Sequence, residues 1–133
     1  MRKLNAAPKP ACLACGLLED GGRALFLARK NQLGVETVEL PCVLLYAGEN
    51  QVARLTEDFR IATGIDAQVH EVLFQRSHNA GSRKRKALIP ALVFRMTAKN
   101  AFAKPGEKFS GFRWIASADL SKFKLARICS WLI

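Results

Sequence analysis

The sequence predicts an α/β sandwich in which short strands surround one central helix. Two observations carry this prediction. Between Asn50 and Thr63 the apolar residues recur at intervals of three and four, which is helical spacing, and Gly64 follows as a helix stop. Much of the remaining chain consists of short apolar segments separated by turn residues and polar stretches, which is typical of strands. A length of 133 residues indicates one domain.

Strands are expected both before and after this helix along the chain. Glu19-Asp20-Gly21-Gly22 is a hairpin signal between the first two strands. Pro90 lies within the sixth apolar segment and predicts that this strand is at an edge or contains a bulge. A short helix over Lys122–Trp131 is expected to close the chain. The predicted strands span residues 11–18, 24–28, 37–40, 42–46, 67–75, 87–97 and 109–115.

The charge balance is strongly basic, with 21 Lys and Arg against 11 Asp and Glu, a net charge of +10. A polyanionic partner such as a nucleotide, a nucleic acid or a membrane surface is therefore one interpretation, and a solvated basic surface is the other. No apolar run reaches the roughly 18–20 residues that a membrane span needs. Residues 1–10 are basic and lack an apolar signal core, which predicts a flexible arm on a cytoplasmic protein, with one domain over residues 11–133.

The four cysteines are Cys12, Cys15, Cys42 and Cys129, of which Cys12 and Cys15 are interpreted as buried free thiols. Cys12 and Cys15 form one Cys-x-x-Cys pair inside an apolar run that is predicted to be a strand. Residues three apart on a strand point to opposite faces, so this pair is not expected to share a metal ion.

Glu49, Phe59, Gly64 and Ile65 stand at the spacing of a known signature. That signature is a Gly, five residues, a Glu, seven residues, Arg-Glu, an apolar residue, any residue, Glu-Glu, any residue, Gly and an apolar residue. It belongs to the Nudix hydrolase family, which the segment from residue 40 to 65 resembles.

Three parts of the segment depart from the signature. Val43 stands in place of the first Gly, and Cys42 in place of the Gly often found before it. Glu57-Asp58 replaces Arg-Glu, and Ile61-Ala62 replaces Glu-Glu. The spacing is kept, whereas most of the carboxylates are not.

The resemblance extends over about residues 11–131. The stretch Leu25-Phe26-Leu27-Ala28-Arg29 is similar to the family's second strand, and Phe112-Arg113-Trp114-Ile115 is similar to its closing strand. The resemblance implies a Nudix-like α/β/α sandwich with a mixed sheet, and it allows a homodimer.

Nudix enzymes, as the resemblance implies, bind Mg²⁺ or Mn²⁺ through glutamates on the signature helix and cleave a phosphoanhydride. Positions 58, 61 and 62 share one helix face, which here holds Asp58, Ile61 and Ala62. The predicted metal ligands are therefore Glu49 and Asp58, and the predicted catalytic residues of an active enzyme are Glu49, Glu57 and Asp58. The alternative is that Glu57 and Asp58 are plain surface residues and that Glu49 favours the helix dipole.

A second candidate site is the run Arg83-Lys84-Arg85-Lys86 between two predicted strands. Together with Arg76 it is predicted to bind phosphate, because Arg suits bidentate phosphate contacts. His78, in the same polar segment, is equally well explained as a plain loop residue. No aromatic side chain that could stack on a base stands beside the run, so specific RNA recognition is not supported.

These observations predict a divergent Nudix-family protein that binds a nucleotide or another phosphate-rich ligand, with hydrolysis lost or weak. One alternative is an active hydrolase of nucleoside diphosphate derivatives with a rearranged metal site, to which Glu71 from a neighbouring strand contributes. Another is a non-catalytic module that binds nucleic acid or protein.

Overall fold

The computed structural model describes residues 9–133. The predicted basic arm, residues 1–10, therefore lies outside the described residues except for its last two positions, and Pro10 is already the first residue of a strand. The elements in chain order are β1 (Pro10–Asp20), β2 (Arg23–Lys30), β3 (Glu36–Glu39), β4 (Cys42–Tyr46), α1 (Gln51–Thr63), β5 (Ala67–Asn79), β6 (Leu88–Ala98), β7 (Gly111–Ile115) and the 3₁₀ helices η1 (Ser117–Lys122) and η2 (Arg127–Leu132).

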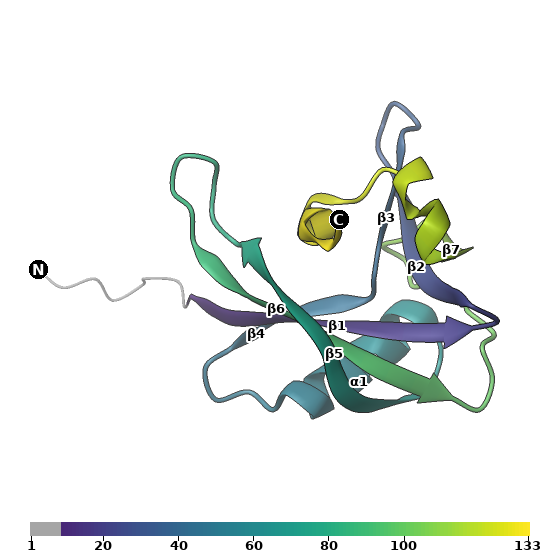
Figure 1. Ribbon diagram of the computed structural model, residues 1–133. Helices are drawn as coiled ribbons and strands as arrows, with labels where there is room; N and C mark the ends of the chain where they lie inside the picture. The colour runs from purple at the N-terminus through teal and green to yellow at the C-terminus, as the bar shows by residue number, and fades with distance from the viewer. Residues whose placement is uncertain (1–8) are drawn as a thin grey trace, which may run out of the picture.

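The strands form a mixed sheet that carries helices on both faces (Figure 1). One part has the order β4-β1-β6-β5, in which β1 and β6 run parallel and the other neighbours are antiparallel. The other part, β3-β2-β7, is antiparallel and joins the first through the β1–β2 hairpin. Because α1 covers one face and η2 the other, the predicted α/β/α sandwich with a mixed sheet is confirmed.

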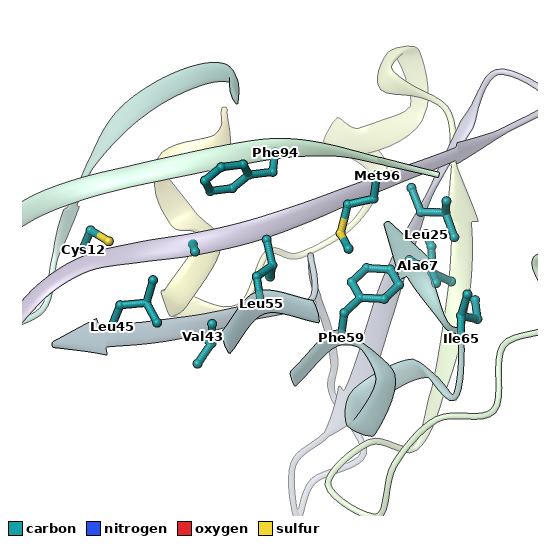
Figure 2. Packing of buried hydrophobic residues seen from close by; sticks show 12 residues of the cluster. Cys12, Leu25, Val43, Leu45, Leu55, Phe59, Ile65, Ala67, Phe94 and Met96 are labelled. Carbon is teal, nitrogen blue, oxygen red and sulfur yellow. The ribbon is translucent and has the colours of Figure 1, made fainter. Parts of the chain in front are cut away.

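β1 is buried on both faces because its apolar residues do not alternate with polar ones. Side chains of one parity, such as Cys12 and Ala14, pack with Leu55 and Phe59 of α1 (Figure 2). Side chains of the other parity, including Cys15, pack in the cluster that contains η2. The prediction that Cys12 and Cys15 are buried on opposite faces is confirmed.

The predicted central helix is confirmed, together with both of its end signals. The Asn50 side chain caps the start by accepting a hydrogen bond from the Ala53 N–H at 2.9 Å. Gly64 ends the helix at φ 75°, a left-handed conformation that suits Gly, and donates to the Arg60 carbonyl. The hairpin prediction is also confirmed, since Gly21 and Gly22 both have positive φ between paired strands.

The predicted closing helix over Lys122–Trp131 is wrong. The Val38 N–H donates to the Lys124 carbonyl, and the Ala126 N–H donates to the Val38 carbonyl, both at 2.9 Å. These bonds to β3 use backbone groups that a continuous helix would need for itself, so η1 ends at Lys122 and only the short η2 forms beyond it. None of the helices in the described residues is long and apolar enough to cross a membrane.

Two expectations about β5 and β6 are adjusted. β5 continues to Asn79, so Arg76 and His78 lie on a strand, and His78 is buried rather than a loop residue. Pro90 pairs with Ser77 of β5 but lies before Ala91, where the pairing of β6 with β1 begins. β6 is an inner strand between β1 and β5, so the prediction of an edge strand is wrong, although Pro90 itself lies where only β5 pairs with β6.

β5 also forms one outer edge of the sheet. Its pairing with β6 is interrupted by register shifts between Val69 and Val72 and between Val72 and Phe74. The neighbouring Leu73 is one of the exposed large apolar side chains of this edge.

Gly16 of β1 provides a test of the packing. A Cβ at this position would stand 2.9 Å from the Phe59 ring and would also meet the Met96 side chain. We expect Gly16→Ala to lower the free energy of unfolding by about 1–3 kcal/mol, the usual cost of overpacking a core, as measured by urea denaturation. Gly111→Ala is the matched control, since the nearest atom there is the Arg113 side chain at 3.7 Å. Equal stability of the two variants would contradict the packing.

Candidate functional site

The main site candidate is a cleft of about 590 Å³ next to the start of β4. Asp58, Ile61 and Ala62 of α1 line it, and so do Cys42 and Val43 of β4. The positions at which the resemblance places metal-binding carboxylates thus meet the positions at which it places glycines. The other lining residues are Leu27, Arg29, Glu39, Leu44, Gly106, Glu107, Lys108, Phe109 and Ile128.

The α1 side of the cleft carries one carboxylate, that of Asp58. Burial raises the pKa of Asp58, and the cations Lys108 and Arg54 offset part of this effect. Ile61 is 58% exposed and Ala62 is 9% exposed, and neither side chain has an oxygen that could bind a metal. The helix therefore offers a single hard ligand to anything that enters the cleft.

A buried acid and a half-exposed base form the β2–β3 side of the cleft. Glu39 is 5% exposed and accepts a hydrogen bond from Arg29 at 2.8 Å. Burial raises the pKa of Glu39, and the Arg29 guanidinium works in the opposite direction. Arg29 also stacks over the Phe109 ring at 4.7 Å, which fixes the plane of its guanidinium.

The loop before β7 brings two further charges to the cleft, Glu107 and Lys108. The loop is held to the end of α1 by backbone bonds from Lys104 to Thr63 and from Gly106 to Ala62, at 2.6 and 2.9 Å. Lys108 acts electrostatically on both Asp58 and Glu39. The cleft thus has Arg29 and Lys108 as cations placed among its carboxylates.

The other predicted carboxylates are engaged elsewhere. Glu49 accepts the Tyr46 N–H at 2.8 Å and pairs with Arg54, so it holds the turn after β4. Glu57 pairs with Arg60 at 3.3 Å on the exposed side of α1. Neither is among the residues that line the cleft, so the structure does not bring them together with Asp58 there.

Glu71, the further carboxylate of the rearranged-site alternative, lies in β5, at the opposite end of the β4-β1-β6-β5 order from β4. Its pKa is lowered by hydrogen bonds from Arg95, at 3.0 Å. It too is absent from the lining of the cleft.

The basic run forms the exposed loop between β5 and β6, which projects at the upper left in Figure 1. Asn79 orders this loop by accepting the N–H groups of Gly81 and Ala87 at 2.9 Å, and Ser82 accepts that of Arg85 at 2.8 Å. Arg83, Lys84, Arg85 and Lys86 are all exposed and do not line the cleft.

Arg76 is separated from this loop by its place in β5. Its guanidinium stacks over the Phe74 ring of the same strand at 4.7 Å. Of the five predicted phosphate-binding cations, four thus belong to the β5–β6 loop and the fifth, Arg76, belongs to the strand that leads into it.

Sequence reasoning missed Glu39, Glu107 and Lys108. Glu39 had one usable signal, since a charged residue inside the apolar run 37–40 indicates a buried group that needs a partner. Arg29, in the stretch similar to the family's second strand, is that partner, because Leu27 and Glu39 are paired residues of β2 and β3. Glu107 and Lys108 lie in a loop whose path depends on contacts with α1, and no local pattern marks them.

The architecture is similar to those of several solved structures. No family model and no curated protein matches the sequence. Among solved structures, the MutT protein from Methanosarcina mazei is similar with a TM-score of 0.70 and 18% identity, over 92% of this chain and 90% of that one. A UDP-X diphosphatase is similar with a TM-score of 0.71 and 14% identity, over 96% of this chain and 61% of that one.

The Nudix domain of Shewanella oneidensis NrtR, crystallised with ADP ribose, is similar with a TM-score of 0.62 and 15% identity, over 94% of this chain and 84% of that one. The shared architecture and the match at Glu49, Phe59, Gly64 and Ile65 agree with one another. This chain therefore has the fold of the Nudix hydrolases.

Proposed function

We propose that this protein binds a nucleotide or another phosphate-rich ligand in the cleft and hydrolyses it weakly or not at all. The observation that carries this proposal is the composition of the cleft wall. Arg29 and Lys108 supply cations for phosphate, and Phe109 and Ile128 supply apolar surface, whereas α1 offers Asp58 as its one carboxylate.

The neighbours in fold support the ligand class. One is a UDP-X diphosphatase, and another was crystallised with ADP ribose. Both names describe a nucleoside diphosphate joined to a second group, which combines an aromatic base with two phosphates. An apolar cleft with a few placed cations suits such a ligand.

The residues of the cleft do not fit the Mg²⁺ or Mn²⁺ site that the fold family implies. Such ions need several oxygen ligands around one point. Ile61 and Ala62 have none, and Glu39 is occupied by Arg29. Among the described residues, no carboxylate belongs to a close group of three metal-ligating side chains. Residual binding through Asp58 is compatible with the proposal, and we derive no catalytic step from it.

Catalysis is the direct test. We expect purified protein with Mg²⁺ or Mn²⁺ to release little product from a panel of nucleoside diphosphate derivatives, because Ile61 and Ala62 replace two glutamates of the signature helix. Product formation is measured as phosphate released after phosphatase treatment. A turnover near 1 s⁻¹ or faster, within the ordinary range for enzymes, that is abolished by Asp58→Asn would support the active-hydrolase alternative instead.

A variant that restores a metal-binding carboxylate tests the same interpretation. Ile61 is 58% exposed and lies one turn from Asp58, so Ile61→Glu places a second carboxylate on the cleft face without burying it. We expect Mn²⁺ affinity, measured by calorimetry, to rise roughly tenfold or more, which is about 1.4 kcal/mol. The gain should vanish in the double variant Ile61→Glu with Asp58→Asn.

The second position responds differently, because Ala62 is 9% exposed and its carbonyl accepts the Gly106 N–H. Adding Ala62→Glu to Ile61→Glu should therefore lower the thermal midpoint, since an unpaired carboxylate is forced into a packed place. If Ile61→Glu stays folded and gains no Mn²⁺ affinity, the path of the backbone at Cys42-Val43, and not the ligand set alone, prevents metal binding.

A nucleic-acid ligand is the second candidate, favoured by the four exposed cations of the β5–β6 loop. Two variants separate the candidates. We expect Lys108→Gln to weaken binding of ADP ribose and leave binding of a short RNA unchanged. Changing Arg83, Lys84, Arg85 and Lys86 to Gln should do the reverse, and should flatten the log–log salt dependence of RNA binding by about 0.7–0.9 per lost contact.

Fluorescence anisotropy for RNA and calorimetry for ADP ribose provide the two affinities. A loop variant that matches the native protein in both would assign the loop to solvated surface. A Lys108→Gln variant that binds ADP ribose with native affinity would contradict the cleft as the phosphate site.

A further inference from the structure

Three cysteines from distant parts of the chain meet at one point inside the molecule. Cys15 lies in β1, Cys42 at the start of β4 and Cys129 in η2, and their three sulfur atoms are all within 4.8 Å of one another. Among the described residues this is the only group of three or more His, Cys, Asp or Glu side chains with such spacing. The fourth cysteine, Cys12, is on the other face of β1.

The backbone fixes this meeting point. Cys15 and Cys42 are directly opposite residues of the antiparallel β1–β4 pair, and the adjacent Gly16 N–H donates to the Pro41 carbonyl at 2.8 Å. The β3 bonds to Lys124 and Ala126 deliver η2 to the same place, and the Cys129 N–H donates to the Ala126 carbonyl at 2.9 Å. Arg127 also donates to the Gly81 carbonyl of the β5–β6 loop. The β1–β4 pairing, the hydrogen bonds to β3 and the Arg127 hydrogen bond therefore hold the three cysteines in place.

We propose that Cys15, Cys42 and Cys129 bind one thiophilic metal ion, of the class that includes Zn²⁺ and Cu⁺. Thiolates are the preferred ligands of these ions in proteins. Tetrahedral Zn²⁺ with bonds of about 2.3 Å sets its sulfur ligands about 3.8 Å apart. The observed spacing needs a contraction of about 1 Å or less to reach that value, which side-chain rotation supplies.

The surroundings suit thiolates that are neutralised by a metal. Cys15 and Cys129 are fully buried among apolar residues, where an uncompensated anion is costly. The thiols of Cys15 and Cys42 lower the pKa of Cys129 by hydrogen bonding to its sulfur, whereas burial raises the pKa of Cys15. Metal binding would release the thiol protons, and the bound cation would neutralise the thiolates that form.

The site lies next to the cleft. Cys42 is half-buried and is one of the residues that line the cleft, as is Ile128, the neighbour of Cys129. Water or a small ligand would complete four-coordinate Zn²⁺ at a site of three sulfurs. Cu⁺, in contrast, needs no ligand beyond the three sulfurs. This inference does not depend on phosphate binding in the cleft.

The test uses the full chain, reduced and stripped of metal by a chelator. Native mass spectrometry after addition of Zn²⁺ or Cu⁺ should show one ion per chain, and Co²⁺ in place of Zn²⁺ should give the intense thiolate-to-metal absorption of cysteine ligation. Competition between Zn²⁺ and Cu⁺ decides which ion the site prefers. Absence of all these signals in a protein that is folded by circular dichroism would overturn the proposal.

Variants locate the site. Cys42→Ser and Cys129→Ser should each weaken binding by more than the roughly 10–100-fold that loss of a supporting group costs. Cys12→Ser is the matched control, since Cys12 is also buried but packs in the cluster with α1 instead. It should retain native affinity. An equal effect of Cys12→Ser and Cys129→Ser would contradict the assignment.

A measurement on the native chain covers the case in which a variant fails to fold. Bound metal should slow alkylation of Cys15, Cys42 and Cys129, identified by peptide mass spectrometry, and leave the rate at Cys12 unchanged. It should also raise the thermal midpoint, because the ion binds the folded state alone. A disulfide between two of the three, formed under mild oxidation in a protein that binds no metal when reduced, would replace the metal site by a redox pair.

Discussion

Burial of β1 on both of its faces is the constraint on which the rest of the structure depends. Its side chains must be covered by α1 on one side and by the C-terminal segment on the other. Gly16 lets Phe59 and Met96 approach the strand closely, so α1 sits deep against the sheet. The parallel pairing with β6 and the antiparallel pairing with β4 then set where every other strand lies.

The local features of this fold could be predicted from the sequence, because short-range physics determines them. Asn50, Gly64 and the Gly21-Gly22 turn each act within a few residues of their position, and each was located correctly. The closing helix was misjudged because a partner far away in sequence, Val38, competes for its backbone.

The candidate sites show the same difference between local features and long-range contacts. Asp58, Ile61 and Ala62 were placed on one face by helical periodicity, and they do line the cleft together. The convergence of Cys15 with Cys42 depends on the register between β1 and β4, and the position of Cys129 depends on how η2 docks. Neither can be obtained from spacing along the chain. Sequence reasoning therefore found that Cys12 and Cys15 are buried thiols without finding that Cys15 lies close to Cys42 and Cys129.

The cleft combines features that act in opposite directions. Arg29 and Lys108 favour an anion, whereas Glu39 and Asp58 oppose one, and burial eases this conflict by raising the pKa of both carboxyl groups. An anionic ligand that enters would raise both pKa values further, because a nearby negative charge disfavours the ionised carboxylates. The phosphate binding that we propose would therefore be coupled to proton uptake, unlike binding in a cleft lined by cations alone.

The interrupted pairing of β5 has a consequence for the solubility of the chain. An outer strand with free backbone groups and exposed apolar side chains is a template on which another chain can add a strand. The two register shifts between Val69 and Phe74 break the regular row of donors and acceptors just where Val72 and Leu73 are exposed. The irregular edge therefore disfavours edge-to-edge aggregation at the position of these exposed apolar side chains.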